Sequence, residues 1–121
     1  MFITWQKTVG GRLKSDPRFS TTPVWNNLPL PNVLPALRPR IILAGQVLRS
    51  IRASHPQRSL ADHYNPLAMD PALVAAHAAL DRVVDKAFGA RRPLTTVADR
   101  QAVLFTCFAA MASGEVLPST L

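Results

Sequence analysis

The densest group of residues that could do chemistry is a set of cations near the N-terminus. Four of them fall within twelve residues, interleaved with Trp5, Phe19 and the pair Gly10-Gly11: Lys7, Arg12, Lys14 and Arg18. Cations placed in this way neutralise phosphates, and glycines let the backbone approach a phosphate chain. The pattern predicts nucleic-acid contact whose affinity is sensitive to salt. The alternative is a solvated basic surface, which the charge alone favours equally.

An asparagine pair follows this group. Asn26 and Asn27 have amides that could donate to phosphates or to base edges. They could instead simply turn the chain before Pro29, and the local composition favours that second interpretation. We keep both residues as candidates for DNA contact.

The charge is unevenly distributed along the chain. The 121 residues carry a net charge of +7, with a pI near 11.1. Residues 1–60 hold nine cations against one acid, Asp16, which makes that half +8, whereas residues 61–121 are close to neutral at −1. A cationic half beside a balanced half is typical of a protein that presents one face to a polyanion.

Metal and nucleophile chemistry is poorly supported. The three histidines have no zinc-ligand spacing to one another or to the single cysteine: His55, His63, His77 and Cys107. His77 lies on the apolar side of an expected helix, which favours a hydrogen-bonded core histidine. Cys107 lies among apolar residues, which favours a buried, inert thiol. We therefore predict no metal site.

The remaining polar residues do not form a catalytic pattern either. Ser20, Ser59 and Ser113 lack a nucleophile-elbow context. Asp81 and Asp85 are four residues apart, but their cationic neighbours favour an exposed charged face over a pair of catalytic carboxylates. Gly10-Gly11 is not followed by the residues of a phosphate loop. The chain is predicted to carry no active site and to bind no cofactor.

The composition also limits the cellular setting. No apolar run approaches the roughly 20 residues of a membrane-spanning helix, and the N-terminus lacks a signal-peptide pattern. A single cysteine is typical of a reducing compartment. We expect a cytoplasmic protein without a membrane partner.

The segment that must position the cations is rich in proline and poor in helix signals. Phe2, Thr4, Thr8 and Val9 favour a short strand around Trp5 that ends at the glycine pair. Between residues 17 and 39 the chain has six prolines, which favours extended or turn structure. We expect residues 1–35 to form an extended, partly β, basic arm.

Three helices are expected after this arm. The first covers residues 41–52, with Ile41, Ala44, Leu48 and Ile51 as its apolar stripe, and is ended by Pro56. The second begins at Pro71 with Asp70 as its N-cap and ends before Gly89, and the third begins after Thr96 and closes at Gly114. Residues 115–121 are expected to fray. The predicted fold is mainly α, with residues 36–121 forming a small three-helix array as a C-terminal helical domain.

Several blocks of residues occur in a characteristic order along the chain. The blocks are Trp5, Gly11-Arg12-Leu13-Lys14-Ser15-Asp16, Arg18-Phe19-Ser20, Asn26-Asn27-Leu28-Pro29-Leu30-Pro31, Leu60-Ala61-Asp62 with Tyr64-Asn65-Pro66-Leu67, Ala76-His77 with Leu80-Asp81 and Val84-Asp85, and Arg100 with Leu104-Phe105. Taken together, they resemble the late part of MmeI-like type II restriction–modification proteins. The N-terminal part resembles the block that closes their target-recognition region, and the rest is similar to their C-terminal helical domain. Leu28 and Leu30 depart from the family's Phe and Trp.

The resemblance implies a piece of an adenine-specific, S-adenosylmethionine-dependent DNA methyltransferase. The family's cofactor and catalytic motifs lie upstream, and Asn65-Pro66 is followed by Leu67, so it is not the catalytic Asn-Pro-Pro-aromatic motif. Because Met1 falls where the family runs on unbroken, we expect an internal start or a truncated reading frame. The chain is not expected to be an enzyme on its own.

Three hypotheses follow. In the first, the chain is a C-terminal methyltransferase fragment whose basic arm contacts the backbone of double-stranded DNA and whose helices brace it. In the second, the helices dock on the remaining methyltransferase domains or on a separate subunit, and the arm is only a tether. In the third, the chain is a truncated relic product.

Overall fold

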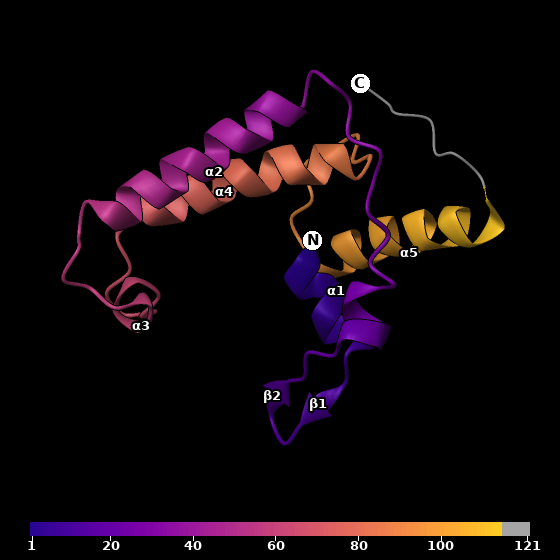
Figure 1. Cartoon of the computed structure of the whole chain (residues 1–121), viewed down its shortest axis with the longest axis horizontal. Helices are drawn as coiled ribbons and strands as arrows, with labels where there is room; N and C mark the ends of the chain where they lie inside the picture. Colours follow the sequence, from indigo (N-terminus) through magenta and orange to yellow (C-terminus); the bar gives the residue numbers. More distant parts are fainter. Residues whose placement is uncertain (115–121) are drawn as a thin grey trace. The chain divides into compact units, whose positions relative to one another are not determined.

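The structure is a computed structural model, and it describes residues 1–114. The fraying expected for residues 115–121 lies outside this described part. The fold is mainly α, as predicted (Figure 1). In chain order the elements are α1 (Phe2–Val9), β1 (Arg12–Leu13), β2 (Asp16–Pro17), the π-helical turn η1 (Thr21–Trp25), α2 (Arg38–Ala53), α3 (Leu60–His63), α4 (Pro71–Ala87) and α5 (Val97–Ser113).

The described chain packs as two compact units. The first unit combines Met1–Val33 with the segment that starts at Asp85, and the second unit is Leu34–Val84. The first unit thus draws on residues from both sides of the expected division between 35 and 36. The division into residues 1–35 and 36–121 stays a prediction.

The first unit is built around the tryptophan of α1. Trp5 is only 2% exposed, and its ring lies 6.3 Å from that of Phe105 and 5.6 Å from that of Phe108, both on α5. Its indole Nε1 donates a hydrogen bond of 2.9 Å to the carbonyl oxygen of Val24 in η1. One buried side chain therefore ties α1 to α5 and to η1.

The prediction of a strand around Trp5 is wrong, because Phe2–Val9 form helix α1. Residues Phe2, Trp5 and Val9 recur at helical spacing, and this spacing turns Trp5 toward α5. Packing of this kind outweighs the β-propensity of Thr4 and Thr8. The hydroxyl of Thr8 donates to the carbonyl of Thr4 at 2.7 Å, so it is satisfied within the helix. The β part of the arm is confined to the two-residue strands β1 and β2.

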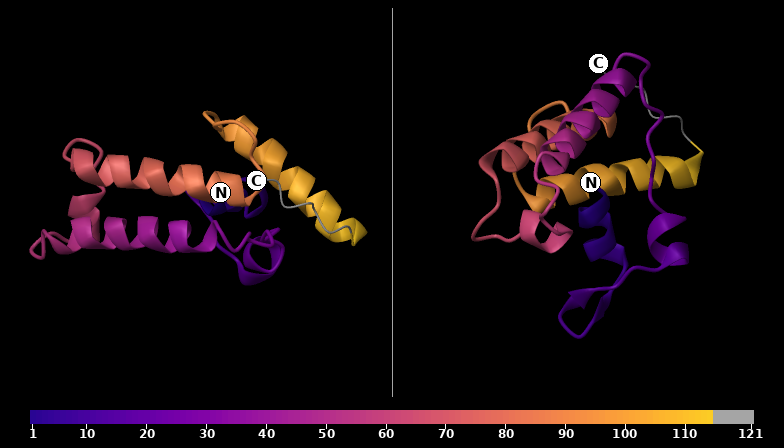
Figure 2. Two further views of the ribbon diagram at one scale, coloured as in Figure 1. Left: turned by 90° about the horizontal axis from the view of Figure 1, so that it is seen from above. Right: turned by 60° about the vertical axis from the view of Figure 1, so that its left-hand side comes forward.

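The second unit is held together by α2 and α4, which run alongside each other (Figures 1 and 2). Leu48 of α2 and Leu73 and Ala76 of α4 are buried at their contact. Partly buried residues complete this core: Ile51, Met69 and Leu80. The residues from α2 agree with the apolar stripe expected for the first helix.

The three expected helices are confirmed, and the ends of α4 and α5 follow the predicted caps. Helix α2 begins at Arg38, three residues before the expected start at residue 41. Asp70 Oδ1 accepts a hydrogen bond of 2.8 Å from the backbone N–H of Ala72 at the start of α4. The hydroxyl of Thr96 accepts from the backbone N–H of Asp99 at 3.1 Å, and the carboxylate of Asp99 accepts from the backbone N–H of Thr96 at 3.2 Å. These two bonds form a capping box at the start of α5. Gly114 ends α5 with a φ of +73°, which favours glycine.

Two short elements were not expected. Ser59 and Asp62 form a second capping box that starts the single turn α3. The turn η1 contains Pro23, whose missing N–H is tolerated in so short a segment. Both elements are shorter than the window over which periodicity gives a signal.

Asp85 differs from the expected exposed charged face, because it is only 4% exposed. Arg100 of α5 reaches it with two hydrogen bonds, from Nε to Oδ1 at 3.2 Å and from Nη2 to Oδ2 at 2.9 Å. A buried carboxylate needs such a partner, since burial without one costs several kcal/mol. The ion pair therefore fastens the end of α4 to α5 within the first unit.

Candidate nucleic-acid interface

A β-hairpin carries three of the four predicted cations. Strands β1 and β2 pair antiparallel, Arg12 opposite Pro17 and Leu13 opposite Asp16. The two residues between the strands are Lys14, with a φ of +58°, and Ser15. The backbone N–H of Arg18 donates to the carbonyl of Gly11 at 3.1 Å and closes the base of the hairpin.

The structure brings Arg12, Lys14 and Arg18 together on this hairpin, while Lys7 lies in the last turn of α1. All four side chains are exposed. Within residues 1–114 none of them forms a salt bridge, and Asp16 is the one acid of the hairpin. We call Arg12, Lys14 and Arg18 the cationic hairpin. Its charge is left free to attract an anion from solvent.

Gly10 fixes where this hairpin leaves α1. A Cβ atom at this position would lie 2.5 Å from the carbonyl oxygen of Arg18, 2.6 Å from that of Gln6 and 2.9 Å from a methyl group of Val24. Only glycine allows α1, the hairpin and η1 to approach so closely. Gly11, with a φ of +67°, then turns the chain into β1.

The asparagine pair lies at the end of η1, and both residues are exposed. The side-chain amide of Asn27 donates to the carbonyl of Thr22 at 3.0 Å, and the backbone N–H of Asn26 donates to the carbonyl of Thr21 at 2.8 Å. These bonds agree with the turn interpretation. Contact of either residue with DNA stays a prediction.

Beside the hairpin lies an aromatic group that sequence reasoning missed. The ring of Phe2 is 6.3 Å from that of Phe19 and 6.0 Å from that of Trp25. Phe19 and Trp25 are 53% and 52% exposed. The helical spacing of Phe2 and Trp5 was the signal that could have placed Phe2 against this group.

The support behind the hairpin comes from α5. The side-chain amide of Gln101 donates to the hydroxyl of Thr8 at 3.0 Å, which joins α5 to α1.

Cys107 is buried, as predicted, with its Sγ 3.4 Å from the carbonyl oxygen of Phe88. Burial raises the pKa of this thiol, which keeps it protonated and unreactive.

The residues around the histidines show what the second unit offers chemically. His55 Nε2 lies 3.2 Å from Asp70 Oδ2, and the hydroxyl of Tyr64 is hydrogen-bonded to His77 Nε2 at 2.9 Å. His77 is half-buried and paired, which agrees with its predicted structural role. No group of three His, Cys, Asp or Glu side chains within residues 1–114 is placed to hold a metal ion.

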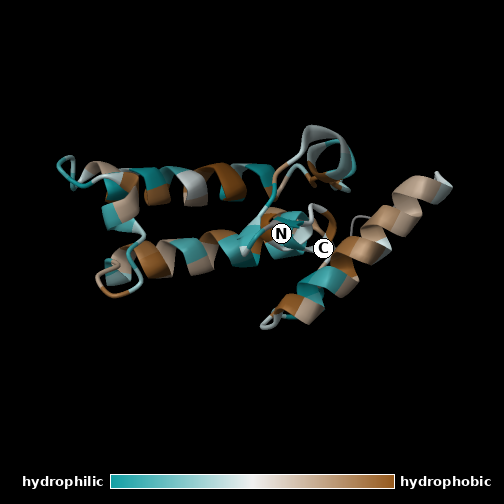
Figure 3. Ribbon diagram, turned by 90° about the horizontal axis from the view of Figure 1, so that it is seen from below, coloured by the Kyte–Doolittle hydropathy of each residue, from teal (hydrophilic) through white to brown (hydrophobic). Residues whose placement is uncertain are grey.

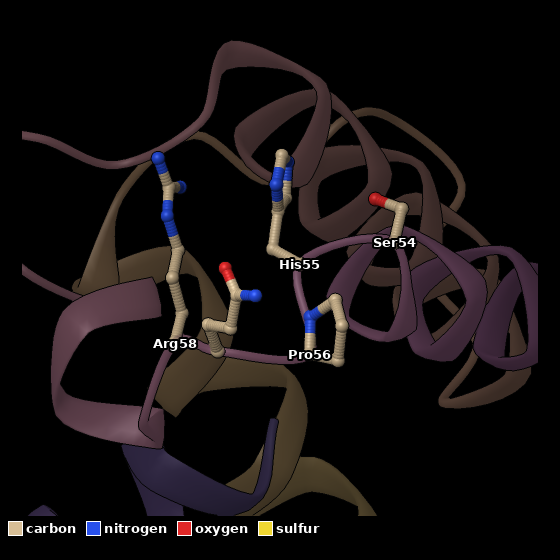
Figure 4. A pocket seen from close by; sticks show the side chains of 5 residues that line it. Ser54, His55, Pro56 and Arg58 are labelled. Atoms are coloured by element: carbon tan, nitrogen blue, oxygen red, sulfur yellow. The ribbon is translucent and has the colours of Figure 1, made fainter.

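A hollow of about 180 Å³ lies at the end of α2, lined by Ser54, His55, Pro56, Gln57 and Arg58 (Figure 4). The hydroxyl of Ser54 donates to the carbonyl of Ile51 at 2.6 Å rather than to His55, so Ser54, His55 and Asp70 do not form a nucleophile–base–acid relay. The volume is below the roughly 300 Å³ of typical cofactor pockets, and no carboxylate lines it. These residues do not fit S-adenosylmethionine.

Among the described residues, no helix has both the length and the apolar character needed to cross a membrane.

The chain is similar to known proteins over most of its length. The family model described as the MmeI C-terminal domain matches residues 35–114, and that of the MmeI target recognition domain matches residues 1–32. DNA methyltransferase A of Bacillus subtilis (strain 168) is 35% identical over 88 residues, which cover 73% of this chain and 10% of that protein.

A solved structure matches as well. It is the structure of the Type IIL restriction-modification enzyme MmeI in complex with DNA, with 33% identity and a TM-score of 0.85 over 93% of this chain and 15% of that chain. The chain therefore spans about a tenth to a seventh of the length of these two relatives. By the extent of the family match, this chain belongs to the MmeI C-terminal domain family, and its residues 1–32 match the MmeI target recognition domain.

Proposed function

We propose that the chain is the C-terminal piece of a site-specific adenine DNA methyltransferase of the restriction–modification type. In this role it contacts the backbone of double-stranded DNA and braces the contacting segment, and it performs no catalytic step. The methyl donor, S-adenosylmethionine, would be bound by parts of the enzyme upstream of this sequence. The family match and the two relatives support the parentage.

The observation that carries the DNA contact is the cationic hairpin. Three exposed cations without a carboxylate partner lie on one short hairpin, within the segment that matches a target recognition domain. Each phosphate that a cation neutralises releases condensed counterions, so affinity falls as salt rises. The buried side chain of Trp5 and the approach of backbones at Gly10 hold the hairpin against α1, and α1 is held by α5.

A salt titration of single variants tests this proposal. Binding of the 121-residue chain to an unrelated duplex is followed by fluorescence anisotropy between about 50 and 200 mM salt. We expect Lys14→Gln to make the negative slope of log Kobs against log[salt] less steep by about 0.9, the contribution of one phosphate contact to B-DNA. The matched control is Lys86→Gln, which removes an exposed lysine from α4. Equal slopes for wild type, Lys14→Gln and Lys86→Gln would exclude the hairpin as the DNA contact.

The outer face of α5 favours docking on another protein domain as a second candidate function. At alternating steps of four and three residues, this face presents exposed apolar side chains: Ala98, Ala102, Phe105, Ala109 and Ala112. In Figure 3 the hydrophilic colour of α5 gathers near its start, and most of the rest is apolar. Helices that are apolar on most sides are usually covered by protein.

Co-purification tests the docking candidate. The bait is DNA methyltransferase A of Bacillus subtilis from which the segment matching this chain has been removed. We expect Ala109→Glu to abolish retention of the chain, because Ala109 is exposed on this face and a charge there is costly to bury. Val74→Glu, a change at an exposed apolar residue of α4, serves as the control and should leave retention unchanged. Retention that survives Ala109→Glu would remove α5 as the docking face.

A further inference from the structure

Helix α2 presents a face of arginines that the cationic hairpin does not include. The 16 residues of α2 contain four arginines and no acid. At 3.6 residues per turn, Arg38, Arg49 and Arg52 fall within a sector of about 60°. This sector lies beside the stripe that includes Leu48 and packs on α4. We call Arg38, Arg49 and Arg52 the arginine face.

The arginine face has no internal charge partner within residues 1–114. The salt bridges there join His55 to Asp70, Arg92 to Asp99 and Arg100 to Asp85, so none involves α2. Arg38 and Arg49 are exposed, and Arg52 is half-buried. By contrast, Arg92 and Arg100 are each matched to a carboxylate. The charges of α2 are therefore available to an external anion.

Gly45 lies in the middle of the same sector and supplies a second observation. It is an interior helix residue, where glycine is less favourable than alanine. A Cβ atom at Gly45 would have no heavy atom within 4 Å, so no internal packing requires glycine there. A glycine with open space in front of it leaves the helix surface flat between the arginines. A flat surface lets an extended partner approach the helix closely.

The residue type and the spacing favour DNA as that partner. The guanidinium group binds phosphate through paired N–H groups, and all three cations of this face are arginine. At a rise of 1.5 Å per residue, Arg38 and Arg49 are about 16 Å apart along the helix axis. That separation, with long flexible side chains at both ends, spans a DNA major groove about 12 Å wide. An acidic protein surface would need no such span.

We infer that the arginine face of α2 is a second contact with the DNA backbone, made by Arg38, Arg49 and Arg52 with Gly45 between them. This inference rests on the proposed DNA-binding function but concerns a different unit of the chain. It predicts that affinity for DNA is spread over the hairpin and α2.

Single variants of the whole chain test the inference against an unrelated duplex. Arg38→Gln, Arg49→Gln and Arg52→Gln should each make the negative slope of log Kobs against log[salt] less steep by about 0.9, and each should weaken binding about eightfold at about 0.1 M salt. Arg82→Gln is the matched control, since Arg82 is exposed on α4 on the side away from its core residues. Its slope should equal that of the wild type.

Gly45→Leu is a second probe whose two effects have opposite signs. Leucine has a higher helix propensity than glycine, so the melting temperature of the chain should rise. The new side chain fills the space in front of the helix, so DNA affinity should fall. A higher melting temperature with unchanged DNA affinity would overturn the inference that DNA approaches α2 closely at Gly45.

The outcomes distinguish this inference from the proposed function. If Lys14→Gln makes the salt dependence less steep while the three α2 variants behave like Arg82→Gln, the hairpin contact stands and the arginine face is rejected. If the α2 variants keep their DNA affinity but lose retention on the truncated methyltransferase A, the face contacts protein and the inference is also rejected. If the wild-type chain does not bind duplex at all, both proposals fail.

Discussion

The buried ion pair between Asp85 and Arg100 allows a quantitative prediction of stability. The change is Arg100→Met, which keeps the length of the side chain and removes its charge. Asp85 is then left 4% exposed without the two hydrogen bonds of 3.2 and 2.9 Å. Breaking one partner of a fully buried pair costs about 3–5 kcal/mol.

Because 21% of the Arg100 side chain is exposed, water offsets part of that cost. We therefore expect Arg100→Met to lower the free energy of unfolding by about 3 kcal/mol, near the lower limit of this range. A chain of this size is stabilised by about 6–18 kcal/mol, so the variant should still fold.

Urea denaturation followed by circular dichroism measures this loss. With a slope of about 1–3 kcal/mol per molar urea, the midpoint should fall by roughly 1–3 M. The double variant Asp85→Leu with Arg100→Met removes both charges and should recover most of the loss, since an apolar pair of similar volume is tolerated. If Arg100→Met lowers the free energy of unfolding by less than about 0.5 kcal/mol, the Asp85–Arg100 pair does not fasten the end of α4 to α5.

Three further predictions follow from the first unit. Gly10→Ala should lower the free energy of unfolding by more than about 1 kcal/mol in urea titration and should weaken duplex binding. The reason is that the alanine Cβ would lie 2.5 Å from the carbonyl oxygen of Arg18. A variant with wild-type stability and wild-type affinity would contradict the close approach of the backbones at Gly10. The hydrogen bonds from Thr96, followed by Arg92, lower the pKa of Asp99 from 3.8 to about 2. A folded-state pKa below the unfolded value stabilises the fold above pH 3.8, and this stabilisation is lost as the pH falls through 2. Melting temperatures between pH 6 and 2 should therefore converge for wild type and Asp99→Asn, and a gap that stays constant with pH would contradict this assignment. Cys107 should react with a thiol reagent slowly in the native chain and rapidly in urea, and equal rates would contradict its burial.

The features that could be predicted from the sequence are those set by near neighbours. Asp70, Thr96 and Gly114 act on backbone groups within a few residues, so local sequence was enough to place the ends of α4 and α5. The stripe through Leu48 was also readable, because one long helix repeats it several times.

The features that escaped prediction depend on residues far apart in the chain. The helical state of α1 depends on Trp5 packing against Phe105 and Phe108, about a hundred residues away. The burial of Asp85 depends on Arg100 in the next helix. Likewise, the cluster of cations was visible in the sequence, but the hairpin that presents it depends on the approach of backbones at Gly10.

The cationic hairpin is the DNA-backbone contact that we propose for this member of the MmeI C-terminal domain family. The salt dependence of duplex binding for Arg12→Gln tests this contact, with Arg82→Gln as a charge-matched control. We expect the negative slope of log Kobs against log[salt] to be less steep by about 0.9 for Arg12→Gln and to equal that of the wild type for Arg82→Gln. Identical slopes for the two variants would contradict the proposed contact.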